Sequence, residues 1–144
     1  MQYKNILTLF AIFISLSFCG LAQDNWNQIA IVGNSLGTDK LTKTEVRDIY
    51  SGDQERWANN NTVIVVIPSS KHAGVSKMCD LLFDKTPDAF KRYWFSLVFQ
   101  GRATPPIYLD SNDQILNYVK NNVGAIGILV DYQGDIDNQL TILD

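Results

Sequence analysis

Residues 68–79, PSSKHAGVSKMC, hold the side chains with the clearest potential for chemistry. The hydroxyls of Ser69 and Ser70 and the ammonium group of Lys71 follow an apolar run and precede an amphipathic one. Where a helix begins after a strand, free backbone N–H groups and the helix dipole attract anions. These residues could therefore bind a small oxyanion. A serine could instead act only as the N-cap of the following helix, and both interpretations stay open.

Three further polar residues are candidates for the same site. Asn34 and Ser35 follow the first predicted strand, and open α/β sheets bind ligands at the carboxyl edge of their strands. Arg102 follows a predicted helix, where its guanidinium could make bidentate contacts to a phosphate or carboxylate. Each has an ordinary alternative, a loop position for Asn34 and Ser35 and a solvated surface position for Arg102. His72 is expected on the surface, in the first turn of a helix.

Other classes of site lack their residue patterns. The sequence has no metal-ligand cluster, nucleophile triad or glycine-rich nucleotide loop, so we expect no metal, no cofactor and no catalysis. Cys79 lies in an apolar stripe and is expected to be a buried thiol. His72 lies two helical turns away, or about 10 Å, which is too far to activate it. The net charge of −3 argues against a nucleic-acid partner, which needs a basic surface.

The segments that must position these residues alternate between strand and helix patterns. Short apolar runs predict strands at 28–33, 62–68 and 124–130, with a possible edge strand at 140–143. Amphipathic periods predict helices at 41–52, 71–84, 86–101 and 111–122. The continuously apolar run at 62–68 indicates a strand buried on both faces. This order predicts an α/β fold with a mixed, mostly parallel sheet flanked by helices.

Several helix signals are local. Thr42 and Glu45 have the spacing of a capping box, and Thr86 is placed to cap the helix at 86–101. Trp94 and Phe95 lie in the middle of that helix among other apolar residues. We therefore expect both aromatic side chains to pack in the core or between helices.

Residues 1–22 have the pattern of a secretory signal peptide. A lysine is followed by the apolar stretch ILTLFAIFISLSF and the small-residue site GLA. We expect cleavage after Ala22, a single domain at 23–144, and a periplasmic or secreted location. Cys19 raises a lipoprotein alternative, which is less favoured because Phe18 stands where lipobox signals have a small residue.

Three motifs, in this order, carry a resemblance to a known family. They are VRDIYSGDQERW (46–57), VIVVIPSS (63–70) and DQILNYVKNNVGAIGIL (113–129). Together they resemble the solute-binding proteins of ABC-type phosphate transporters. The stretch FQGRATPP (99–106) is similar to one in small, single-domain members of that group. The resemblance implies a single lobe of the periplasmic-binding-protein-like (type II) fold, and a binding protein rather than an enzyme.

The resemblance also implies a ligand and a partner. The ligand would be phosphate or another small oxyanion at the loop 69–74, and the partner a membrane transporter or envelope protein. Two features differ from the family. Its members enclose the ligand between two lobes, and their loop carries an arginine and a Ser-Gly-Thr triplet that are absent here. The second hypothesis is therefore a ligand-free interaction or sensory scaffold that contacts an envelope protein.

Overall fold

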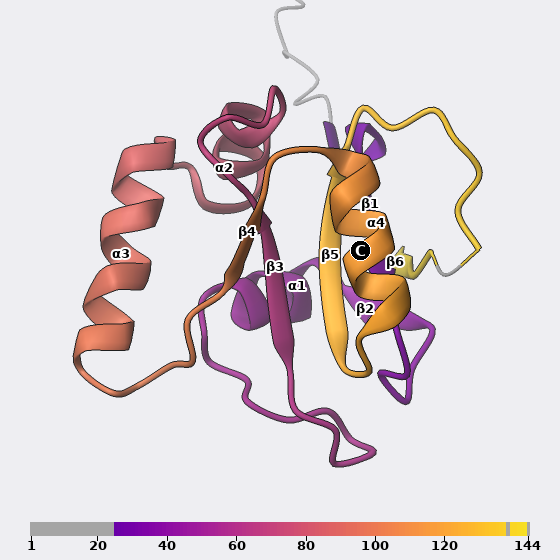
Figure 1. The fold of residues 1–144 in the computed structure, drawn as a ribbon, viewed down its shortest axis with the longest axis horizontal. Coiled ribbons are helices and arrows are strands. Elements are labelled where there is room, and N and C mark those ends of the chain that lie inside the picture. The colour runs from indigo at the N-terminus through magenta and orange to yellow at the C-terminus, as the bar shows by residue number, and fades with distance from the viewer. Residues whose placement is uncertain (1–24, 138, 144) are drawn as a thin grey trace, which may run out of the picture.

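The structure is a computed structural model that describes residues 25–137 and 139–143. Its centre is a four-stranded sheet with the strand order β1-β5-β3-β4 (Figure 1). The strands are β1 (Ile29–Gly33), β3 (Ile64–Pro68), β4 (Ile107–Leu109) and β5 (Ala125–Val130). The strands predicted at 28–33, 62–68 and 124–130 are confirmed as β1, β3 and β5. The predicted signal peptide, its cleavage site after Ala22 and the Cys19 alternative lie outside the described residues.

The directions of the strands decide which loops meet. β3 runs parallel to its neighbours β4 and β5, whereas β1 runs antiparallel to β5. The carboxyl ends of β3, β4 and β5 therefore lie at one edge of the sheet, here called the carboxyl edge. The carboxyl end of β1 lies at the opposite edge, here called the amino edge. The sheet is mixed and mostly parallel, as predicted.

Four helices cover the two faces of the sheet. They are α1 (Lys43–Tyr50), α2 (Val75–Phe83), α3 (Pro87–Phe99) and α4 (Asn112–Asn121). α4 packs on one face through Ile115 and Val119, which share a core cluster with Val66 of β3. The buried stripes of α1, α2 and α3 share the other cluster with Val65. Val65 and Val66 are 8% and 0% exposed, so the predicted burial of this strand on both faces is confirmed.

Local signals set two of the helix starts. The backbone N–H of Glu45 donates to Thr42 Oγ1 at 3.1 Å, and the backbone N–H of Thr42 donates to Glu45 Oε2 at 2.7 Å. The predicted capping box is therefore present. The hydrogen bonds that the Glu45 carboxylate accepts from the backbone N–H and the hydroxyl of Thr42 lower its pKa. Thr86 caps α3 by accepting the backbone N–H of Ala89 at 3.3 Å. Both helices begin where the sequence predicts because each cap lies within one turn of its partner.

The aromatic residues of α3 divide between core and surface. Trp94 is 2% exposed, as predicted, but Phe95 is 53% exposed and Phe99 is 89% exposed. The predicted core packing of Phe95 is wrong. α3 lies at the outer margin of the molecule (Figure 1). Its buried residues are Phe90, Trp94 and Leu97, and Phe95 lies outside this buried stripe.

A second, two-stranded sheet flanks β1. It pairs β2 (Lys40–Thr42) with β6 (Thr141–Leu143) in parallel, so the predicted edge strand at 140–143 is confirmed as β6. An isolated antiparallel bridge between Val32 and Gln139 connects the C-terminal segment to β1. A short 3₁₀ helix, η1 (Asn25–Gln28), precedes β1.

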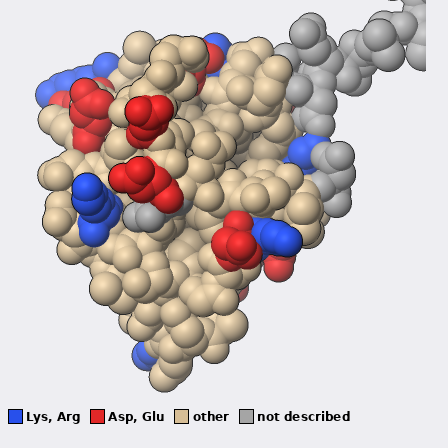
Figure 2. All heavy atoms as spheres, turned by 90° about the vertical axis from the view of Figure 1, so that its right-hand side faces the viewer, with Lys and Arg blue, Asp and Glu red and all other residues tan. Residues whose placement is uncertain are grey.

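The surface is mixed in charge where Figure 2 displays it. Most of the Lys and Arg side chains on that face lie beside an Asp or Glu side chain (Figure 2). Within the described ranges, none of the helices has the length and apolar character needed to cross a membrane.

Candidate functional site

The loop after β3 forms a tight turn at the carboxyl edge. The backbone N–H of Ser69 donates to the carbonyl oxygen of Leu109, at the end of β4, at 2.8 Å. Ser69 Oγ accepts the backbone N–H of Lys71 at 3.1 Å, and its carbonyl oxygen accepts that of His72 at 3.0 Å. The structure therefore places Ser69, Ser70 and Lys71 together, next to the end of the neighbouring strand.

Asp110 completes a polar cluster with this loop. The Ser69 hydroxyl donates a hydrogen bond to Asp110 Oδ1, and Lys71 Nζ lies 3.8 Å from Asp110 Oδ2. The side chains of Lys71 and Asp110 are 79% and 50% exposed, so the cluster faces solvent. The backbone N–H of Asp110 donates to Gln114 Oε1 at 2.9 Å, and this hydrogen bond connects the backbone of Asp110 to α4. We call Ser69, Lys71 and Asp110 the carboxyl-edge cluster.

Sequence reasoning did not select Asp110. Its signal was its position, directly after the short strand that ends at Leu109 and before Ser111. Ser111 caps α4 by accepting the backbone N–H of Gln114 at 3.3 Å. Residues that follow parallel strands lie at the same edge of the sheet, so Asp110, after β4, lies near the loop after β3. The position of Asp110 between a strand and a helix cap could therefore have identified it from the sequence.

His72 is buried rather than exposed. Only 6% of its surface is accessible, so the prediction of a surface position is wrong. Its Nδ1 accepts the backbone N–H of Gly74 at 2.9 Å, and Nε2, which must therefore carry the proton, donates to Asn112 Oδ1 at 3.1 Å. Asn112 Nδ2 also donates to the carbonyl oxygen of Val130 at 2.8 Å. His72 thus connects the loop to α4 and β5.

The helix that follows the loop begins later than the sequence predicts. α2 starts at Val75 with Gly74 as its N-cap, and no side chain caps it. The interpretation of Ser69 or Ser70 as the cap is therefore wrong. A Cβ atom added to Gly74 would lie 2.5 Å from Val130 Cβ, so this turn packs tightly against the end of β5. Ser69, Ser70 and Lys71 therefore lie in the loop before α2 and not in its first turn.

Two other predicted residues lie at the amino edge. Because β1 is antiparallel, Asn34 and Ser35 are at the far end of the sheet from Ser69. Asn34 Nδ2 donates to the carbonyl oxygens of Val119 and Lys120, each at 3.0 Å, where it binds the last turn of α4. The expectation that these residues share an edge with Ser69 is wrong, and their contacts are those of a structural loop.

Arg102 also lies away from the carboxyl-edge cluster. It follows α3 and precedes β4, and its backbone N–H donates to the carbonyl oxygen of Leu97 at 3.0 Å. Since β4 runs parallel to β3, the segment that enters β4 lies at the amino edge. Arg102 therefore cannot act on a ligand bound at Ser69 and Lys71.

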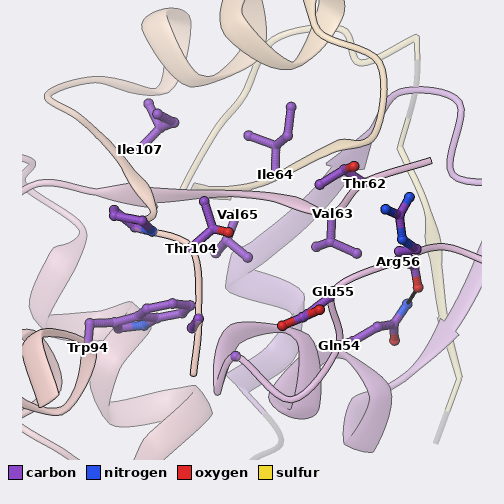
Figure 3. A pocket seen from close by; sticks show the side chains of 13 residues that line it. Gln54, Glu55, Arg56, Thr62, Val63, Ile64, Val65, Trp94, Thr104 and Ile107 are labelled. Carbon is purple, nitrogen blue, oxygen red and sulfur yellow. Dashed lines mark hydrogen bonds between the residues drawn. The ribbon is translucent and has the colours of Figure 1, made fainter. Parts of the chain in front are cut away.

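A cavity of about 350 Å³ opens at the amino edge (Figure 3). Val63 and Val65 contribute apolar surface, while Glu55 and Thr104 contribute a carboxylate and a hydroxyl. Trp94 also lines it, and its indole Nε1 is buried without a hydrogen-bond partner in the described part of the chain. The mixture of groups could accommodate a small polar molecule, but the lining residues include no nucleophile, histidine or metal-ligand cluster.

Cys79 is a buried thiol, as predicted. It is fully inaccessible, and burial raises the pKa of its thiol to about 11. The histidine considered as its base is engaged by Gly74 and Asn112. No group of three or more His, Cys, Asp or Glu side chains that could hold a metal occurs among the described residues.

Solved structures share this fold. They include an ABC-type phosphate transport receptor from Vibrio cholerae (20% identity, TM-score 0.53), a phosphate ABC transporter substrate-binding protein with bound phosphate from Clostridium perfringens (18%, 0.58) and PstS from Borrelia burgdorferi (14%, 0.58). Each comparison covers 80% of this chain, but the chain spans only 46%, 44% and 47% of those proteins, respectively. The predicted fold, a single lobe of the periplasmic-binding-protein-like type, is confirmed. No protein-family model and no curated protein matches the chain.

Proposed function

We propose that this chain is an exported solute-binding domain that binds a small oxyanion at the carboxyl-edge cluster. The observation that carries the proposal is the convergence of a hydroxyl, an ammonium group and a carboxylate from Ser69, Lys71 and Asp110. The fold supports it, because two of the solved structures that share the fold are named for phosphate transport. Localisation in the periplasm or outside the cell rests on the signal-peptide pattern of residues 1–22.

The carboxylate restricts which oxyanion fits. An anion beside Lys71 also lies beside Asp110, because the two side chains approach to 3.8 Å. An anion without a proton would be repelled by that carboxylate, whereas one that keeps a proton could donate a hydrogen bond to it. At neutral pH phosphate keeps at least one proton and sulfate keeps none. Phosphate is therefore the preferred ligand of this site over sulfate.

The second candidate is a scaffold that contacts an envelope protein or a membrane transporter. Its supporting observation is that Ser69 already donates a hydrogen bond to Asp110 and Lys71 already forms an ion pair with it, so both residues have a partner without a ligand. The loop also lacks the arginine and the Ser-Gly-Thr triplet of the phosphate-binding family. In that case the carboxyl edge would keep its shape but would not bind an anion.

Calorimetry of the processed chain with phosphate and with sulfate distinguishes the two candidates. The oxyanion proposal expects phosphate to bind, with an affinity that Lys71→Ala lowers about three- to tenfold, since an exposed charge contributes modestly. Lys120→Ala is the matched control, because Lys120 is an exposed cation on the last turn of α4 at the opposite edge. The absence of binding heat at millimolar phosphate, from a folded and monodisperse sample, would favour the scaffold.

A further inference from the structure

An apolar cavity of about 470 Å³ lies between α3 and the edge strand β4. Its floor includes Ile67, Cys79 and Phe90, which are 1%, 0% and 2% exposed. Phe95 and Tyr108 also line it, yet they are 53% and 41% exposed. Two aromatic side chains thus border a cavity while much of their surface remains in water. A molecule that filled the cavity would remove apolar surface from water on several sides.

Most of the polar side chains around this cavity can donate a hydrogen bond. The ammonium group of Lys91 and the hydroxyls of Ser70 and Tyr108 have no hydrogen-bond partner within the described ranges. The Ser69 hydroxyl is already committed to the carboxyl-edge cluster. Asp88 supplies the one carboxylate among the lining residues. An excess of donors that includes a cation favours a ligand with an acceptor-rich, negatively charged group.

We propose that this cavity binds an amphipathic carboxylate. Its aromatic or branched aliphatic body packs against Phe95 and Tyr108, and its carboxylate lies at Lys91 and Ser70. The volume is within the range of small-molecule sites, about 300–1,000 Å³. The site does not depend on the oxyanion proposal, since an inorganic anion gains nothing from an apolar floor. Asp88 opposes the carboxylate, so its neutralisation should strengthen binding.

The test uses trans-cinnamate as the probe and cinnamyl alcohol as its neutral counterpart, measured by NMR titration of the processed chain. Cinnamate should bind with an affinity that Phe95→Ala lowers at least about tenfold, because an aromatic wall is lost. Phe99→Ser is the matched control. Phe99 is 89% exposed, lies one turn further along α3 and does not line the cavity. Both variants alter exposed side chains, and circular dichroism checks that they fold.

The charge of the ligand is tested separately. Lys91→Gln should weaken cinnamate about fivefold and leave cinnamyl alcohol unchanged, while Asp88→Asn should tighten cinnamate. Lys71→Ala should leave the affinity for cinnamate unchanged, because Lys71 does not line the cavity, so failure of the oxyanion proposal would leave this result intact. Lack of cinnamate binding at millimolar concentration by the folded chain would overturn the proposal. An equal loss of cinnamate affinity in Phe99→Ser and Phe95→Ala would also overturn it, because it would indicate adsorption to the surface of α3. The same holds if cinnamyl alcohol binds as tightly as cinnamate.

Discussion

Replacement of Asp110 by Asn tests whether this carboxylate selects the oxyanion. The Asp110 side chain is 50% exposed and its Oδ2 lies 3.8 Å from Lys71 Nζ. An anion that contacts both groups lies about 4 Å from the carboxylate charge. In water-like surroundings two unit charges at that distance repel by about 1 kcal/mol, and doubly charged sulfate by about 2 kcal/mol. Asp110→Asn removes this repulsion without changing the shape of the side chain. Sulfate affinity should rise about tenfold after allowance for salt screening.

Phosphate should respond differently to the same substitution. It also escapes repulsion, but it loses a hydrogen bond to a charged acceptor, worth about 1.5–3 kcal/mol. The two changes nearly cancel, so the ratio of phosphate to sulfate affinity should fall about tenfold. Calorimetry with both anions measures this ratio, and Asp113→Asn, in the first turn of α4, is the control. An unchanged ratio in Asp110→Asn would refute the assignment of anion selectivity to this residue.

Three further predictions concern stability and reactivity. Thr42→Ala removes the N-cap of α1 and should cost about 1 kcal/mol in urea denaturation. Because the pKa of Glu45 is lowered in the fold, the contribution of the capping box should be lost as pH falls through that lowered value, and Thr42→Ala should then cost less. Cys79, with a pKa of about 11, should resist thiol reagents until denaturant is added. Because burial raises this pKa above its unfolded value of about 8.5, the free energy of unfolding should decline as the pH rises above about 8.5. Gly127→Ala should destabilise the fold by about 1–3 kcal/mol, because the new Cβ would lie 2.6 Å from Ile115 Cγ2; an unchanged denaturation midpoint would contradict this packing.

The sequence predicted the elements because their signals are local. The cap of α1 depends on Thr42 and Glu45, which are three residues apart, and the cap of α3 depends on Thr86 and Ala89. The continuous apolar run that ends at Pro68 predicted a strand buried on both faces without knowledge of its neighbours. Helix periodicity also identified Trp94 as a core residue, but it could not show that Phe95 lies outside the buried stripe of α3.

The composition of the candidate site was decided by tertiary structure. Ser69 and Asp110 are 41 residues apart in the chain and meet only because β3 and β4 are parallel neighbours. Because β1 is antiparallel to β5, Asn34 lies at the amino edge and not at the carboxyl edge with Ser69. The direction of a strand depends on long-range pairing that no local pattern encodes. By itself the sequence determined the four helical segments and the strands at 28–33, 62–68 and 124–130, because caps and periodicity act within a few residues. It did not identify the short strands β2 and β4 or the later start of α2. Only the tertiary structure decided which polar side chains share an edge, because that depends on the order and direction in which distant strands pair.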